Sequence, residues 1–352
     1  MTLLALALLT GWATGNPAQI AKGKEVYEVA CLLCHGKDGS GNPEWESPVR
    51  PTSFSDCGST GESTDLWVSI VANGGAKHGL ADLMPAFGEA FPPEDLLAVV
   101  AYLRTLCAKA DRYPPGDLNF RRTLGVTKAF PESEAVITAR FIPFEGETEM
   151  EFSYENRLGP RFQYEIEVPV RPFVSTKEKY PAGLEDVSLA GKYVLGFDVA
   201  RLWILSGGLR VSLPNGNDGK RLGAGTTVFT PFLLFGKGLK GGSLQGRIGA
   251  DLPINTNRAA RNYQYALAYS FPAMGFSRTG FVPEIEFVGA FNAKSHQKIL
   301  VMGISKALNR LGHVTASAGL AIPLRPEGSW VERQYRAYVL WDFADGPFWR
   351  GW

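Results

Sequence analysis

The chain has 352 residues, with 36 Lys and Arg against 35 Asp and Glu, and a formal net charge of +1 at pH 7. This balance gives no electrostatic basis for binding nucleic acid or a strongly acidic partner. The 40 glycines, 23 prolines and 12% aromatic residues favour short strands separated by turns over a helical bundle. The length allows two domains, or one domain and a large barrel.

The first fifteen residues have the pattern of an export signal. An apolar run, Leu3 to Leu9, precedes small residues near Ala13 to Gly15, where cleavage is expected. No Lys or Arg precedes this run, so an upstream start or an uncleaved anchor are the alternatives to the signal peptide that we predict over 1–15. No later stretch reaches the ~18 apolar residues of a transmembrane helix. Any further membrane crossing would therefore use strands.

A short amphipathic helix, expected over 18–27, leads into the sequence Cys31-Leu-Leu-Cys34-His35. The Cys-x-x-Cys-His spacing is the attachment signature of a c-type haem, with two thiols on one helical turn and a histidine beside them. A thioredoxin-like motif or half of a zinc site would need a βαβ context or a second ligand pair. We predict one covalent haem c, bound through Cys31 and Cys34, with His35 as the proximal iron ligand.

Two further helices are expected, over 65–72 and from Pro93 to about 103, which completes a helical haem domain over 16–110. Between them lies Leu83-Met84-Pro85-Ala86-Phe87, and here the chain resembles the class I cytochrome c family over about residues 17–109. The resemblance implies that Met84 is the distal ligand, which raises the reduction potential and suits electron transfer. Two alternatives are that Met84 only fills the core and that His78, expected on an exposed loop between Lys77 and Gly79, ligates instead.

Cys57 and Cys107 are the two remaining cysteines. In an oxidising periplasm they are expected to form a disulfide. The alternative is a pair of buried free thiols that pack as small apolar side chains.

After a linker predicted over 111–130, the sequence over 131–352 alternates with period two. About twelve segments of ~9 to 11 residues place apolar and aromatic residues on one face and polar residues on the other. Long and short connections alternate, which is typical of an antiparallel up-and-down outer-membrane barrel. We treat Glu165, Glu167, Glu284 and Glu286 as polar wall residues. A soluble β-sandwich or a periplasmic ligand-binding barrel is the alternative fold.

The run from Gly183 to Leu189 followed by Lys192-Tyr193 looks like a strand entry of outer-membrane barrels grouped with aromatic-degradation transporters, and the chain ends on Trp352 as many of these barrels do. Gly346, Pro347 and Gly351 depart from that pattern. The fused architecture is similar to the porin-cytochrome electron conduits.

The expected function is single-electron transfer, not catalysis, by a haem domain held at the periplasmic face of the outer membrane. The expected partners are periplasmic redox proteins or a small redox molecule, together with outer-membrane lipid. Two alternatives stay open, a redox-linked outer-membrane transporter of small molecules and a soluble periplasmic haem enzyme subunit with a β domain that binds substrate.

Overall fold

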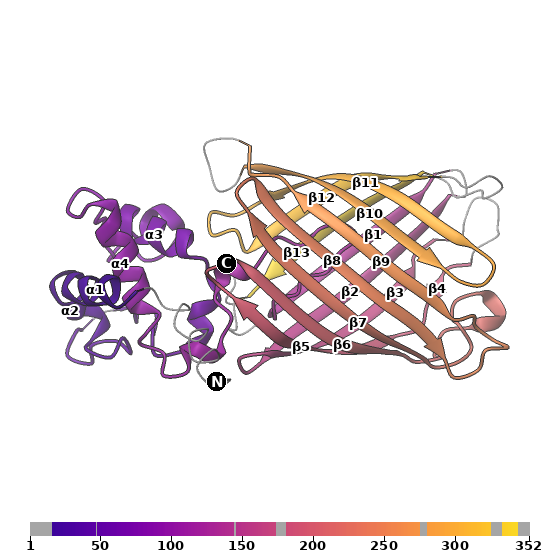
Figure 1. The fold of residues 1–352 in the computed structure, drawn as a ribbon, viewed down its shortest axis with the longest axis horizontal. Helices are drawn as coiled ribbons and strands as arrows, with labels where there is room; N and C mark the ends of the chain where they lie inside the picture. The colour runs from indigo at the N-terminus through magenta and orange to yellow at the C-terminus, as the bar shows by residue number, and fades with distance from the viewer. Residues whose placement is uncertain are drawn as a thin grey trace, which may run out of the picture. The chain divides into compact units, whose positions relative to one another are not determined.

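The computed structural model describes residues 16–46, 48–143, 146–173, 181–274, 280–324 and 333–343. The chain divides into two compact units, one formed mainly by residues up to 119 and the other mainly by residues from 120 onward. The predicted signal peptide and the C-terminal residues 344–352 lie outside the described residues. Figure 1 shows helices in the first unit and strands in the second.

The first unit contains the three predicted helices. They are α1 (Pro17–Ala30), α3 (Thr64–Asn73) and α4 (Pro93–Leu103), and a short helix α2 (Leu32–His35) follows α1 directly. The side chain of Asn16 caps α1 by accepting from the Gln19 N–H, and Ser63 caps α3 in the same way, as expected for short polar residues at helix starts. Within the part of the chain that the structure describes, no helix is long and apolar enough to cross a bilayer.

The second unit is a closed barrel of twelve strands, as predicted. The strands of the barrel wall are β1 (Glu134–Ile142), β2 (Glu147–Leu158), β3 (Phe162–Arg171), β5 (Ser188–Asp198), β6 (Trp203–Ser212), β7 (Val228–Leu239), β8 (Gly242–Pro253), β9 (Asn262–Ser270), β10 (Phe281–Phe291), β11 (His296–Ala307), β12 (Val314–Pro323) and β13 (Gln334–Asp342). A two-residue strand, β4 (Gly183–Leu184), pairs with the end of β3. Each wall strand lies beside the wall strands that precede and follow it in the sequence. β1 pairs antiparallel with both β2 and β13, which closes the barrel.

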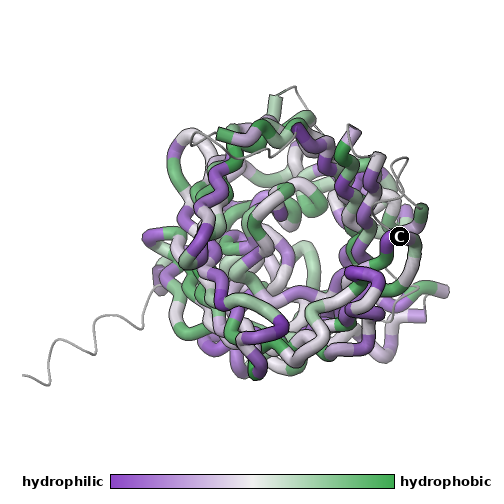
Figure 2. Tube along the Cα trace, turned by 90° about the vertical axis from the view of Figure 1, so that its right-hand side faces the viewer, coloured by the Kyte–Doolittle hydropathy of each residue, from purple (hydrophilic) through white to green (hydrophobic). Residues whose placement is uncertain are grey.

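The barrel buries its polar face and exposes its apolar face. On β10, Glu284 and Glu286 are only 3% and 1% exposed, whereas Phe281 and Ile285 on the same strand are 46% and 41% exposed. Figure 2 shows hydrophobic and hydrophilic residues alternating along the barrel trace. A protein that folds in water has the opposite arrangement, so this outer face matches a hydrocarbon environment and disfavours the soluble alternatives.

The lengths of the connections differ between the two ends of the barrel. At the end where β1 begins, four connections are short, 159–161, 199–202, 240–241 and 308–313, and one is longer, 271–280. At the other end, four are longer, 172–187, 213–227, 254–261 and 324–333, and two are short, 143–146 and 292–295. Most connections thus follow the asymmetry that the sequence predicts, and in outer-membrane barrels the short turns are periplasmic.

Residues 120–133, here called the inner segment, cross the lumen of the barrel without regular secondary structure. The backbone groups of the inner segment find hydrogen-bond partners among the side chains of the barrel wall. They would otherwise lack partners because the segment has no regular secondary structure. Lys192 on β5 donates to the carbonyl oxygens of Lys128 and Phe130 (2.8 and 2.9 Å), and Tyr338 on β13 donates to that of Arg122 (2.6 Å). Because these strands lie on different sides of the barrel, the segment is held from several directions.

Buried ion pairs also fix the inner segment. The Arg122 guanidinium lies 2.8 Å from Glu155 and 3.3 Å from Glu134, and the Lys128 ammonium lies 2.7 Å from Glu134 and 2.9 Å from Glu132. All five side chains are less than 9% exposed. The polar inner wall is thus paired with cations that the segment supplies.

Replacing both Arg122 and Lys128 with Met should loosen the inner segment and raise ion conductance. Removing one partner of a buried pair leaves an uncompensated charge and costs ~3 to 5 kcal/mol, so Glu134 and Glu155 would favour hydration of the lumen. Single-channel recording in planar bilayers measures the change, with the exposed Arg310→Met as the matched control. Conductance of the double variant equal to that of the control would show that the segment does not close the lumen.

Candidate functional site

The residues of the predicted haem site line one mostly apolar cavity in the helical unit. Cys31, Cys34 and His35 come from the end of α1 and from α2, and Met84 comes from the connection between α3 and α4. Leu83, Pro85, Phe87, Val49 and Pro51 are among the other lining residues. The fold therefore brings together four side chains that lie up to 53 positions apart in the sequence.

The backbone around the Cys-x-x-Cys-His sequence is held by a continuous set of hydrogen bonds. The Cys31 N–H donates to the Tyr27 carbonyl and the His35 N–H donates to the Cys31 carbonyl, both at 2.9 Å. Gly36 then ends the helix with φ of 73°, and a Cβ there would lie only 2.7 Å from the Gly41 carbonyl oxygen. Glycine is required at this position because the chain reverses in the left-handed region.

Both motif cysteines are free thiols and are half-buried. Burial, and then the neighbouring Cys34, raises the pKa of the Cys31 thiol to about 11. Burial also lowers the pKa of His35 and so favours the neutral imidazole, against the opposing effect of a hydrogen bond from the ring to the Thr52 backbone. Neutral imidazole is the form that ligates a metal ion. The ring stacks on Phe54, with centroids 4.7 Å apart.

The segment that carries Met84 is attached to the end of α3. The Gly75 N–H donates to the Met84 carbonyl (3.0 Å), and the Phe87 N–H donates to the Val71 carbonyl (3.0 Å). Gly74 allows this close approach, because its φ is +80° and a Cβ there would lie 3.0 Å from the Met84 carbonyl oxygen. These contacts fix the position of Met84 beside the cavity.

His78 does not line the cavity. Its Nε2 lies 3.2 Å from Ser69 Oγ on α3, and the residue is only 8% exposed. The neighbours Lys77 and Gly79 are exposed as expected, but the His78 side chain itself is buried because its ring lies against Ser69 of α3. With its ring engaged by Ser69, His78 is a poor competitor for Met84.

The crossing of α1 and α4 places the Cys-x-x-Cys-His sequence. A Cβ on Gly23 would lie 2.0 Å from the Ala98 carbonyl oxygen and 2.9 Å from Tyr102 Cβ, so only glycine permits the two helices to touch here. Tyr27, one turn later, donates from its hydroxyl to the Gly36 carbonyl (2.6 Å), and burial raises its pKa well above the ordinary value.

A disulfide joins Cys57 to Cys107, as predicted. Close to it, the buried Arg104 guanidinium donates to the carbonyls of Thr60 (2.9 Å) and Glu62 (2.8 Å) and lies over the Trp67 ring. Asp117 accepts from the backbone N–H of Thr64 at 2.9 Å and from its hydroxyl at 2.8 Å. Sequence reasoning missed Arg104 and Asp117, although an arginine directly after a buried apolar helix face was an available signal.

The donor set fits a c-type haem. Two free thiols one helical turn apart would carry the thioether bonds, and the His35 imidazole and the Met84 thioether would ligate the iron. The remaining lining is mostly apolar, which limits water around the group.

The comparison with protein families agrees with this geometry. Residues 18–103 match the family of the cbb3-type cytochrome c oxidase subunit III. This part of the chain is a cytochrome c domain. A curated relative, the cbb3-type cytochrome c oxidase subunit FixP of Azorhizobium caulinodans, is 29% identical over 106 residues, which is 28% of this chain and 31% of FixP. The chain thus matches about a third of that relative's length.

The barrel resembles porins among solved structures. The KdgM porin covers 60% of this chain and is itself covered to 99%, with 11% identity and a TM-score of 0.43. The NanC porin covers 59% and is covered to 99%, with 10% identity and a TM-score of 0.44. The strand count and closure of the present barrel come from its own strand pairing.

Replacing Gly23 with Ala should destabilise the cytochrome domain. Overpacking typically costs ~1 to 3 kcal/mol, and the contact with a backbone carbonyl leaves no flexible side chain to move aside. Thermal unfolding followed through the haem absorbance measures the loss, with Lys24→Ala on the exposed face of α1 as the control. Equal Tm values for the two variants would refute the packing argument.

Proposed function

We propose that this protein transfers single electrons through a c-type haem, and that its barrel holds the cytochrome domain at the periplasmic face of the outer membrane. The observation that carries the proposal is the shared cavity of Cys31, Cys34, His35 and Met84. A haem bound there supplies an iron that changes between the ferrous and ferric states.

The protein's own side chains favour electron transfer over substrate chemistry. His35 and Met84 would hold the iron from both sides, which would leave no coordination position for oxygen, peroxide or another substrate, and a thioether ligand would favour the ferrous state. The exposed Leu83 and Val49, 45% and 48% exposed, lie at the same cavity. An apolar edge of this kind suits brief contact with a periplasmic redox protein or a small redox molecule.

The barrel supports an anchoring role. Its apolar outer face suits outer-membrane lipid, and its short turns suit the periplasmic side. The inner segment lies inside the lumen and is hydrogen-bonded to the wall from β5, β10 and β13, which argues against free passage of large solutes. Since the inner segment follows residue 119 directly in the sequence, the barrel would tether the cytochrome domain to the membrane.

Met84→Ala should remove the sulfur ligand and leave one coordination position of the haem iron open. We expect the weak red absorption band of the ferric protein, which reports sulfur ligation, to be lost, and the reduced haem to bind carbon monoxide. The reduction potential should fall, because a soft donor no longer stabilises ferrous iron. Visible spectra and redox titration of the detergent-extracted protein measure all three effects.

Met302→Ala is the matched control, because Met302 lies on β11 and is 45% exposed on the barrel surface. His78→Ala should leave the red band unchanged. A wild-type protein that already binds carbon monoxide, or a red band that survives in Met84→Ala, would contradict the proposed ligation and favour a gas-binding or enzymatic role.

A further inference from the structure

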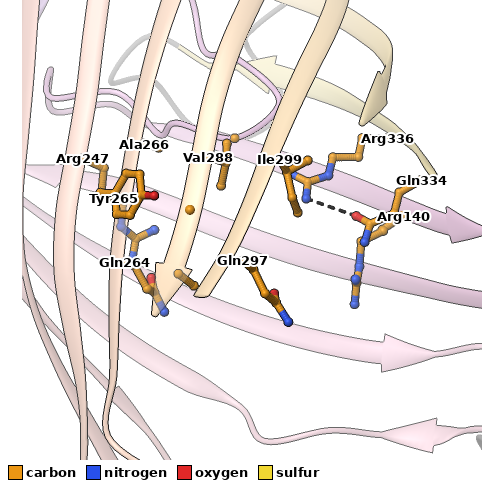
Figure 3. Close-up of a pocket in the computed structure, with 13 residues that line it drawn as sticks. Arg140, Arg247, Gln264, Tyr265, Ala266, Val288, Gln297, Ile299, Gln334 and Arg336 are labelled. Carbon is orange, nitrogen blue, oxygen red and sulfur yellow. Dashed lines mark hydrogen bonds between the residues drawn. The ribbon is translucent and has the colours of Figure 1, made fainter. Parts of the chain in front are cut away.

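A second cavity of about 230 Å³ lies inside the barrel, beside Gly125 of the inner segment. Figure 3 shows side chains from several strands that project into it. Its charged and amide lining residues are Arg140, Arg247, Arg336, Gln264, Gln297 and Gln334. No carboxylate lines it among the described residues. A space of this size holds about seven water volumes at ~30 Å³ each, which is enough for a small organic solute.

The arginines lie at two ends of the cavity. In Figure 3, Arg247 on β8 stands on one side and Arg140 on β1 and Arg336 on β13 stand on the other, with Val288 and Ile299 between them. The space therefore has two cationic ends, and the part between them is lined by Val288, Ile299 and the amide of Gln297.

Several of the guanidinium donors have no acceptor within the described part of the chain. The Nε and Nη2 atoms of Arg247 are buried and unpartnered, and its guanidinium lies over the Phe232 ring at 5.5 Å. The Nε of Arg336 is also buried without a partner, while its Nη2 donates to Gln334 Oε1 at 3.1 Å. Arg140 differs, since its Nε donates to Glu149 at 2.8 Å.

The carboxylates on neighbouring strands are already engaged by other donors. Asp251 on β8 accepts from Thr230 (2.8 Å) and Gln264 (2.7 Å). Glu286 on β10 accepts from the Thr123 hydroxyl and from the Gly125 N–H, both at 2.8 Å, through a single oxygen. Asp251 and Glu286 lie close enough to act electrostatically on Arg247 and Arg336 respectively, but no acceptor within the described residues reaches the Nε and Nη2 of Arg247 or the Nε of Arg336. A buried donor without an acceptor is costly.

We propose that this cavity binds a short linear dicarboxylate, with one carboxylate at Arg247, the other at Arg336 and the chain against Val288 and Ile299. A guanidinium presents its donors in a planar fork that matches a carboxylate, and such charge-assisted pairs are the stronger hydrogen bonds of proteins. The inference concerns the barrel alone and holds whether or not the cytochrome domain carries electrons.

Isothermal titration calorimetry of the detergent-solubilised full chain tests the proposal, with succinate, glutarate and adipate as probes. We expect saturable binding of at least one of them and no comparable binding of acetate or of the dication putrescine. Arg247→Gln and Arg336→Gln should each weaken binding ~10-fold or more. The exposed Arg310→Gln should leave binding unchanged.

Glutamine is chosen because its amide keeps part of the hydrogen-bond donor capacity of arginine while removing the charge. A variant counts as folded when its haem spectrum and the circular dichroism of its barrel are unchanged from the wild type. If one variant does not fold, the other and the wild-type probe series still decide the question. Absence of binding for all three dicarboxylates would overturn the proposal. Acetate binding as tight as that of the dicarboxylates would also overturn the proposal, because it would show that a second carboxylate is not recognised. Undiminished dicarboxylate binding in a folded Arg247→Gln or Arg336→Gln protein would overturn it as well.

Discussion

Charge pairing between the barrel wall and the inner segment is the interaction on which the second unit depends. A barrel that exposes its apolar face must turn its polar face inward, where buried carboxylates are costly unless cations reach them. Arg122 and Lys128 supply these cations to Glu134 and Glu155, and Lys192 reaches across in the other direction to the segment's carbonyls. The segment can remain irregular because the wall satisfies its backbone.

The same pairing bears on function. A lumen crossed by the chain's own backbone is poorly suited to a redox protein or to a wide solute path, which supports the proposal that the barrel attaches the cytochrome domain to the membrane. The sequence holds one Cys-x-x-Cys-His motif, and its other two cysteines form the disulfide. Under the function proposed above, electrons enter and leave at one membrane face.

The helices, the haem motif and the twelve-stranded barrel could be predicted because each depends on local spacing, whereas the disulfide could be predicted because Cys57 and Cys107 were the two cysteines left in an oxidising compartment. Period-two alternation is visible in a single strand such as Phe162–Arg171, and the Cys31 to His35 spacing is fixed by one helical turn. The inner segment could not be predicted. Its order comes from partners such as Glu286, 163 positions from Thr123, and such long-range pairs leave no periodic signal.

The residues around the cytochrome site show the same limit. The Met-Pro context pointed to Met84, and the structure places Met84 at the cavity, whereas the contact of His78 with Ser69 depends on how a short turn packs against α3. Glu284 and Glu286 were assigned to the wall, and the structure gives Glu286 a more specific role in holding Thr123 and Gly125. Local patterns thus identify the chemical groups, and the tertiary contacts decide which of them act.

Reduction of the haem in sealed proteoliposomes tests the central claim most directly. A membrane-impermeant reductant is added outside the vesicles, and the fraction of haem that becomes reduced is measured. That fraction is compared with the fraction of cytochrome domains that an external protease removes from the same preparation. We expect the two fractions to agree, with the remainder reduced only after detergent opens the vesicles. Complete reduction in intact vesicles that still protect part of the cytochrome domain from protease would show that electrons or reductant cross the barrel, and would contradict the account.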